Sequence, residues 1–236
     1  VYGQQVAIEW ADTQGLDVTS AGQLEPRVRT WYNPERRSSD FLIPGLMVVI
    51  IMVVAVQQTA VSLVREREQG TDEQLAISPL RGWEMMIGKL AQWTLLAFAE
   101  LAAITAVGVW FFHLPLRGSL GVLAVGAALF VFCSLGLGLV ISAVAPTLES
   151  ANMLGLLLSI LPAFILSGFA FPLGSIPVAL QAFSWLFPAR FMVSISRGVF
   201  LKGAGVAELW PELLTLAGYA VVVIAVAVVL SARRRR

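Results

Sequence analysis

Few side chains in this sequence could support covalent chemistry. The sequence has one histidine, His113, and one cysteine, Cys133, which lies in an apolar run. The short signatures of metalloproteases, serine hydrolases and dithiol oxidoreductases (H-E-x-x-H, G-x-S-x-G and C-x-x-C) do not occur. Gly88-Lys89 is close to the end of a nucleotide-binding loop, but Trp83 stands where that loop needs glycine and Leu90 where it needs serine or threonine. We therefore expect no catalytic residue, metal, cofactor or ATP site in this chain.

The densest group of charged side chains lies between Arg65 and Lys89. Gly70 suits a helix end in the left-handed conformation, and Thr71 with Gln74 has the spacing of a capping box. This pattern predicts one or two short amphipathic helices lying against the membrane. A capped, rigid helix of this kind is a feature that a partner protein could push. A plain solvated loop between two spans is the alternative.

A few polar residues interrupt the apolar runs. Glu100 is expected to face protein or water, because a charge in the middle of a membrane is costly. Gln57 and Glu100 are candidate residues of a transport pathway, with interhelical hydrogen bonding as the alternative. Arg190 and Arg197, seven residues apart, are predicted to anchor lipid headgroups, and binding of an anionic substrate is the alternative.

The elements that must position these residues are apolar enough to cross a membrane. The chain of 236 residues is 58% hydrophobic and 13% charged, with a mean hydropathy of +0.81. Soluble domains are about 45–50% apolar and about 25% charged. Five runs are close to or above the length of a membrane helix, about 20 residues, namely 41–64, 90–112, 119–145, 150–167 and 213–232. We predict an all-α integral membrane protein with about five transmembrane helices.

The chain divides into a short polar part and a membrane part. Residues 1–40 are mixed and polar and are predicted to end an extracytoplasmic domain, whereas residues 41–236 form the transmembrane domain. The net charge of +1 leaves no broad basic surface for nucleic acid. The charged segment 65–89 lies between the first two of the five runs.

A long uncharged stretch lies between the fourth and fifth runs. Residues 150–189 carry no charge and are interrupted by prolines, including Pro172 and Pro188. Gly168 opens a break in apolar surroundings, and non-helical backbone at membrane depth must be buried in protein or line a cavity. We therefore predict a re-entrant or interfacial segment over 168–202, with its re-entrant part at 172–187.

Basic residues are equally numerous on the two predicted sides of the membrane. The arginine cluster 233–236 directly follows a span, and such clusters favour the cytoplasm. This places the C-terminus and the segment 65–89 in the cytoplasm. The residues 1–40 and the re-entrant segment then lie outside.

Several motifs follow one another along nearly the whole chain. They are Tyr32-Asn-Pro-Glu35, Phe41-Leu-Ile-Pro-Gly45, Arg65-Glu-Arg-Glu-Gln-Gly-Thr71, Gly88-Lys89, Leu166-Ser-Gly-Phe-Ala-Phe-Pro172, Phe187-Pro-Ala-Arg190 and Arg197-Gly-Val-Phe-Leu-Lys-Gly203. In this order they resemble the ABC-2 type permeases of ABC exporters. The resemblance implies six spans, with an extracytoplasmic domain between the first two. The chain would then start inside that domain and lack the first span.

The resemblance also implies partners and a site. Two permease copies and two separate ATPase subunits, which bind ATP and magnesium, form such an exporter in a bacterial-type inner membrane. The cytoplasmic coupling segment matches residues 66–77, with Glu66, Gly70, Thr71, Glu73, Gln74 and Leu75 as its candidate contacts. The external re-entrant segment matches residues 168–188. ATP-driven closure of the ATPases is expected to displace the helix at 71–77.

Other functions are weighed against this one. A secondary transporter or channel usually needs several charges within the membrane and often an inverted repeat, and neither is seen. A membrane-embedded enzyme lacks its nucleophile, base and metal. A non-transporting membrane assembly factor of the same fold is a further alternative. Drug, lipid, polysaccharide and peptide substrates all fit, as do a homodimer and a heterodimer.

Overall fold

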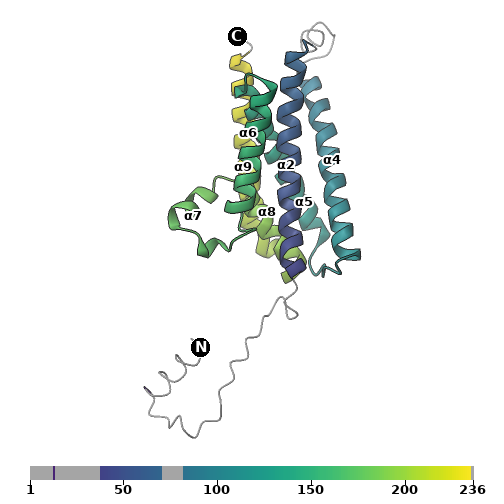
Figure 1. Cartoon of the computed structure of the whole chain (residues 1–236). Helices are drawn as coiled ribbons and strands as arrows, with labels where there is room; N and C mark the ends of the chain where they lie inside the picture. Colours follow the sequence, from purple (N-terminus) through teal and green to yellow (C-terminus); the bar gives the residue numbers. More distant parts are fainter. Residues whose placement is uncertain (1–12, 14–37, 71–81, 235–236) are drawn as a thin grey trace. The chain divides into compact units, whose positions relative to one another are not determined.

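The computed structural model describes residue 13, residues 38–70 and residues 82–234, and regular structure in these parts is helical throughout (Figure 1). Almost all of the predicted extracytoplasmic segment, 1–40, lies outside the described residues. Residues 1–36 and residues 37–236 form two separate units. Every helix discussed below belongs to the second unit.

Among the described residues, four long helices come first, a group of short helical segments follows, and a fifth long helix ends the chain. The long helices are α2 (Ser38–Glu68), α4 (Gly82–Trp110), α5 (Leu120–Val144), α6 (Leu148–Leu161) and α9 (Val206–Arg234). The short segments are the π-helix η1 (Pro162–Leu166), the 3-10 turn η2 (Leu173–Ser175), α7 (Val178–Ser184), α8 (Pro188–Arg197) and the π-helix η3 (Gly198–Lys202).

Five of the helical stretches in the described residues are long and apolar enough to cross a membrane. They are Asp40–Glu68, Leu90–Trp110, Leu120–Val144, Leu148–Leu166 and Val206–Leu230. The bent pair α7–α8 adds a broken span or a re-entrant loop. The prediction of an all-α membrane protein with about five spans is therefore confirmed.

Several helices extend beyond the apolar runs that predicted them. α2 begins at Ser38, three residues before the predicted run 41–64, so that Pro44 lies inside the helix. α9 begins at Val206, before the predicted start at residue 213, and Glu208 caps it by accepting a hydrogen bond from the Gly205 amide at 3.0 Å. Polar residues continue these helices because backbone hydrogen bonding does not end where hydropathy falls.

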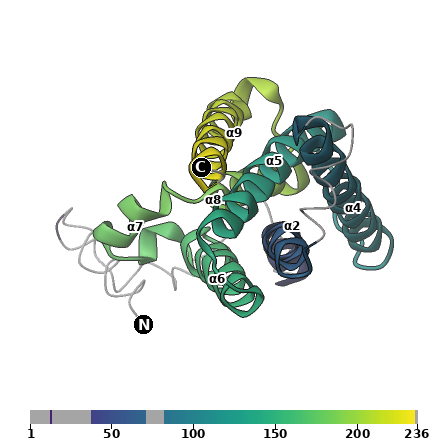
Figure 2. The same cartoon turned by 90° about the horizontal axis from the view of Figure 1, so that it is seen from above.

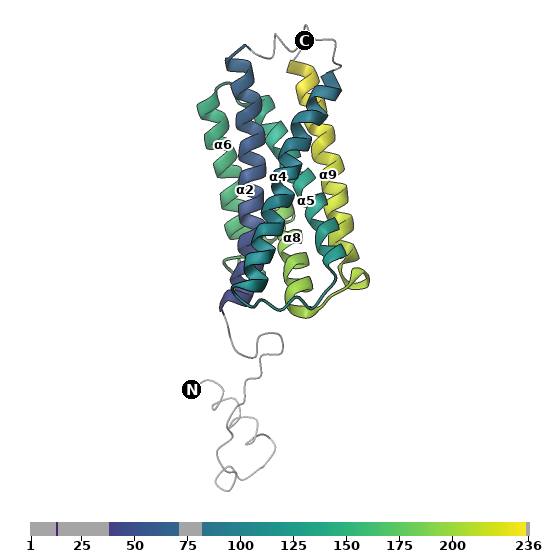
Figure 3. The same cartoon turned by 90° about the vertical axis from the view of Figure 1, so that its right-hand side faces the viewer.

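Burial separates two central helices from three peripheral ones. About 56% of the residues in the apolar window of α2 and 61% in that of α5 are buried, against 17% for α4, 28% for α6 and 22% for α9. Viewed along the helices, α5 lies between α9 and α2, and α2 lies between α4 and α6 (Figure 2). Figure 3 shows the same bundle from the side, with α6 and α9 at opposite edges.

Small residues allow α5 to approach α2 closely. Ser134, Gly138 and Ser142 recur every four residues in the sequence, a spacing that predicts a helix-packing face, and all three are buried. A Cβ added to Gly138 would lie 2.7 Å from the Thr59 Cβ and 2.8 Å from the Val56 carbonyl oxygen. The two helices therefore touch with almost no side chain between them.

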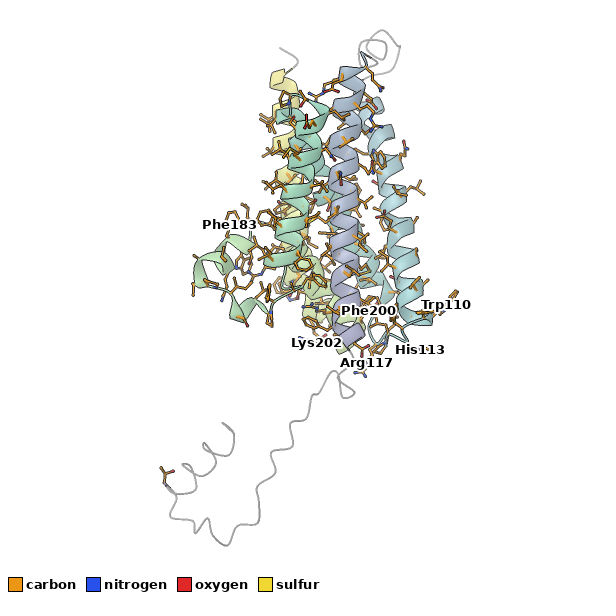
Figure 4. All side chains as sticks on the ribbon, viewed as in Figure 1. Trp110, His113, Arg117, Phe183, Phe200 and Lys202 are labelled. Atoms are coloured by element: carbon orange, nitrogen blue, oxygen red, sulfur yellow. The ribbon has the colours of Figure 1, made fainter. Side chains whose placement is uncertain are left out.

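The two ends of the bundle carry different parts of the chain. Trp110, His113, Arg117 and Lys202 lie at the end where α2 begins, and the C-terminus lies at the other end (Figure 4). α2 and α9 both finish at that other end, at Glu68 and Arg234, as the alternation of spans requires (Figure 1).

Candidate functional site

The predicted coupling segment begins where α2 ends. α2 continues through Glu66, which is half-buried, to Glu68. Gly70 then adopts a φ of +69° and donates its amide to the Arg67 carbonyl at 3.2 Å, which is the left-handed helix end predicted for this glycine. No atom lies within 4 Å of a Cβ placed on Gly70. Conformation, and not lack of space, therefore requires glycine here.

The other predicted coupling residues are Thr71, Glu73, Gln74 and Leu75, and they lie outside the described residues. The described part of the segment nevertheless shows how it is bounded. The expected loop 65–89 is shortened at both ends, because α2 extends to Glu68 and α4 begins at Gly82. The charged residues 65–68 belong to the last turn of α2.

The last turn of α2 is attached to the turn between α5 and α6. The Arg67 guanidinium donates to the Ser142 carbonyl of α5 and, at 3.3 Å, to the Leu63 carbonyl of its own helix. The Glu68 carboxylate accepts the Leu148 amide at 2.7 Å, at the first residue of α6. A carboxylate is favourable at a helix N-terminus, so this contact stabilises the start of α6.

The start of α6 is fixed by a capping box that the sequence analysis missed. Thr147 accepts the Ser150 amide at 3.2 Å, and the Ser150 hydroxyl accepts the Thr147 amide at 3.1 Å. Glu149, which precedes the predicted run 150–167, lies in the first turn of this helix. The spacing of Thr147 and Ser150 was the available signal, but the search for such boxes favours glutamate or glutamine at the third position.

A polar cleft opens between these elements. Its volume is about 540 Å³, and its lining comes from the end of α2, the α5–α6 turn and the first turns of α6: Val61, Arg65, Glu68, Thr147, Leu148, Glu149 and Asn152. One cation and two carboxylates meet there. The cleft therefore lies at the end of the bundle from which the predicted coupling segment leaves.

The predicted pathway residue Gln57 lies near this cleft and is bonded across to α6. Its Nε2 donates to the Oδ1 of Asn152 at 2.5 Å. The predicted interhelical hydrogen bond is thus present, and Asn152, whose side chain is exposed, is a residue that sequence reasoning missed. Gly155 is close by, since a Cβ on it would lie 3.5 Å from the Gln57 Cα. We refer to this surface as the α2–α6 face.

Glu100, the second predicted pathway residue, lies elsewhere. It is on α4, which packs on the other side of α2 from α6 (Figure 2). Its side chain is partly exposed, but the Oε2 atom is enclosed and has no hydrogen-bond partner among the described residues. The structure therefore does not bring Gln57 and Glu100 together.

Between α6 and α9 the chain forms a break and two short helices, α7 and α8. η1 ends at Leu166, and Gly168 follows with a φ of +82°. α7 and α8 meet at a bend of 88°. α6 ends toward the same end of the bundle at which α9 begins (Figure 1), which agrees with the predicted re-entrant segment.

The two prolines predicted for this segment mark helix starts. Pro172 is exposed and precedes η2. Pro188 is buried at the first position of α8, where the missing amide costs little. Gly168 is buried in the break between η1 and η2, and a Cβ on it would lie 3.2 Å from the Leu173 Cγ.

Arg190 holds the bend between α7 and α8. Its guanidinium donates to the Gln181 carbonyl at 3.0 Å and to the Ser184 hydroxyl, and it lies 4.4 Å from the centre of the Trp185 ring. The predicted role as a headgroup anchor did not include these contacts. The side chain supplies donors to the C-terminal end of α7, which lacks helical donors of its own.

Arg197 joins the break after η1 to the start of α2. It donates to the Gly168 carbonyl at 2.8 Å, the Phe169 carbonyl at 3.2 Å and the Phe41 carbonyl at 3.4 Å. Its guanidinium carbon lies 3.7 Å from the centre of the Phe41 ring. Like Arg190, it binds backbone carbonyls, which no pattern in the sequence indicated.

Comparison with known proteins places these features in a family. A family model described as ABC-2 family transporter protein matches residues 8–229. The probable multidrug ABC transporter permease YbhR of Escherichia coli K12 is 34% identical over 186 residues, which are 79% of this chain and 50% of YbhR. The inner membrane transport permease YhhJ of the same strain is 32% identical over 200 residues, 82% of this chain and 51% of YhhJ. The chain spans about half the length of these curated relatives.

Proposed function

This chain belongs to the ABC-2 family of transporter proteins, and from that premise we propose that it is the membrane-spanning permease part of an ATP-driven exporter. The single observation that carries the proposal is the family match over nearly the whole helical bundle, from residue 8 to residue 229. The permease forms the path of the substrate and performs no covalent chemistry. ATP and magnesium bind to two separate ATPase subunits, and a second permease copy completes the complex in a bacterial-type inner membrane.

Coupling to the ATPases takes place at the end of α2. The continuous helix to Glu68 and the left-handed turn at Gly70 support this role, because they present the segment that follows at one end of the bundle. In the proposed complex an ATPase contacts Glu66, Gly70, Thr71, Glu73, Gln74 and Leu75. A push on this segment then reaches α5 through Arg67 and α6 through Glu68.

The substrate path follows the α2–α6 face. The polar cleft supports an entrance at the end of the bundle that we assign to the cytoplasm, and the Gln57–Asn152 pair lies next along it. Farther along, α6 and η1 expose large apolar side chains: Met153, Leu157, Ile160 and Leu161 in α6, and Phe164 in η1. This order of surfaces suits a substrate that is mostly apolar and has a few hydrogen-bonding groups.

The test of coupling uses the full-length permease purified with its ATPase subunits in lipid nanodiscs. The double variant Glu66→Ala with Thr71→Pro removes a carboxylate and an amide donor from the coupling segment. We expect it to insert in the membrane normally but to lose the stimulation of ATPase activity by the permease. Wild-type stimulation in a correctly inserted double variant contradicts the proposed coupling site. Failure of the wild-type permease to bind any ATPase subunit contradicts the proposed function itself.

A further inference from the structure

The first turns of α2, which contain Pro44, accept side-chain hydrogen bonds from a neighbouring helix. Two neighbouring residues of α8 supply donors to this region. Ser196 donates its hydroxyl to the Pro44 carbonyl at 3.0 Å, and Arg197 donates to the Phe41 carbonyl at 3.4 Å.

The same guanidinium also binds the break at Gly168 and Phe169. These two carbonyls follow η1, where the chain has left its helix, and they accept at 2.8 and 3.2 Å. An arginine can serve three acceptors at once because its planar fork carries five donors. One side chain therefore ties α8, the break and α2 together.

Packing brings the break against α2 at the same place. Phe169 is buried, with 5% of its surface exposed, and its ring lies over Gly45 of α2. A Cβ on Gly45 would be 3.2 Å from the Cγ of Phe169, so no larger residue fits at position 45 without displacing the ring. The break is thus seated on α2 and not only hydrogen-bonded to it.

α2 connects this joint with the coupling end of the bundle. It is one helix of 31 residues, which corresponds to about 46 Å at 1.5 Å per residue. Its other end is attached to the α5–α6 turn through Arg67 and Glu68. A displacement applied near Gly70 is therefore carried to the opposite end by a continuous helix.

The structure assigns to Arg197 the task of making α2 and the break at Gly168–Phe169 move as one body. Through this joint, movement at the coupling end of α2 reaches the re-entrant segment. Arg197 is in this sense a positioning residue for transport. The inference rests on the proposed coupling to ATPase subunits near Gly70.

The experiment reads the two ends of α2 separately and needs no transported substrate. The full-length permease, with native cysteines replaced, is purified with its ATPase subunits in nanodiscs. Gln69→Cys reports on the coupling end, and Ser175→Cys, an exposed position in η2, reports on the re-entrant segment. Maleimide labelling at each position is measured by peptide mass spectrometry, with and without ATP and vanadate. In the native background we expect the nucleotide to change the labelling rate at both positions.

Arg197→Gln is expected to keep the nucleotide response at position 69 and to lose it at position 175. Arg197→Lys keeps the positive charge but not the planar guanidinium with its several donors, so we expect the response at position 175 to be lost here too. Arg117→Gln is the matched control. Arg117 also lies at the end of the bundle where α2 begins, and it also donates to a backbone carbonyl, that of Leu201, at 3.3 Å. This control is expected to keep both responses.

A disulfide supplies an independent connection in place of the guanidinium. The pair Gly45→Cys with Phe169→Cys is chosen for this bond because the Phe169 side chain lies directly against Gly45. Oxidation of this pair in the Arg197→Gln background is expected to restore the response at position 175. A native response at 175 in Arg197→Gln overturns the inference, and so does a disulfide that forms without restoring it. Absence of any response at position 69 in the native complex contradicts the proposed function instead.

Discussion

At Gly70 the backbone conformation alone requires glycine. The φ of +69° is costly for a residue with a Cβ, while the space around the Cα is open. Gly45 is the opposite case, because the Phe169 ring fills the space where a side chain would be. Both glycines occur in motifs that resemble the family, so the sequence does not distinguish them. Gly70 is required by its backbone conformation and Gly45 by lack of space.

Gly70→Ala is expected to weaken coupling without disturbing the bundle. Alanine in the left-handed conformation costs about 1–2 kcal/mol, so the native helix end becomes roughly tenfold less populated relative to other conformations. The measurement is the permease-stimulated ATPase rate of the full-length complex, which should fall. Gly88→Ala is the control, since Gly88 lies inside α4 with no atom within 4 Å of a Cβ. Equal rates for the two variants would contradict the role of the Gly70 turn.

Two arginines at the re-entrant segment show what residue type alone does not reveal. Both were predicted to anchor lipid headgroups, and both bind backbone carbonyls at helix ends. Their acceptors are backbone atoms, which every residue has, so no side-chain pattern marks them. A useful rule follows for other membrane chains: an arginine near a break in an uncharged stretch is a candidate partner of the carbonyls freed there.

At the scale of elements, the contact between α2 and α5 depends on backbone proximity. Gly138 brings α5 against Thr59 and the Val56 carbonyl, and Gly136 on the same helix meets Val223 of α9. Apolar helices gain little from the hydrophobic effect by leaving lipid for each other, so close packing has to supply the stability. The two central helices achieve it with small residues.

Gly138→Ala is expected to destabilise the bundle. The new methyl group would lie 2.7 Å from the Thr59 Cβ and 2.8 Å from the Val56 carbonyl oxygen, and overpacking of this kind costs about 1–3 kcal/mol. The midpoint of thermal unfolding in detergent should fall by several degrees. Gly218→Ala in α9 is the control, because nothing lies within 4 Å of its Cβ, and it should be neutral or slightly stabilising. A Gly138→Ala protein as stable as the control would show that the helices can separate at no cost.

At the scale of the molecule, α2 is the helix that connects the other helices to one another. It contacts α4, α5, α6 and α8, its end at Glu68 holds the start of α6, and its start at Phe41 is held by Arg197. The described helices thus provide one continuous physical connection between the predicted coupling segment and the re-entrant segment. The proposed exporter mechanism uses that connection.

The orientation of the bundle can be tested by labelling. In right-side-out vesicles, with Cys133→Ser and other native cysteines replaced, a membrane-impermeant maleimide should reach His113→Cys directly. It should reach Gln74→Cys only after permeabilisation, because we assign the coupling segment to the cytoplasm. Labelling of position 74 in sealed vesicles would invert the topology and remove the coupling site from the side of the ATPases.

The sequence by itself determined the fold class and the number of spans. Lipid allows only segments that bond their own backbone and have apolar surfaces, so apolar runs of sufficient length predict helices directly. It also indicated the helix end at Gly70 and the small-residue face of α5, since both depend on local conformation or spacing. Only the tertiary structure decided that α2 continues through Pro44, that Gln57 of α2 bonds α6 whereas Glu100 lies on α4, and that Arg197 joins three segments. Those contacts link residues far apart in the chain, and several of them end on backbone carbonyls whose positions no sequence pattern specifies.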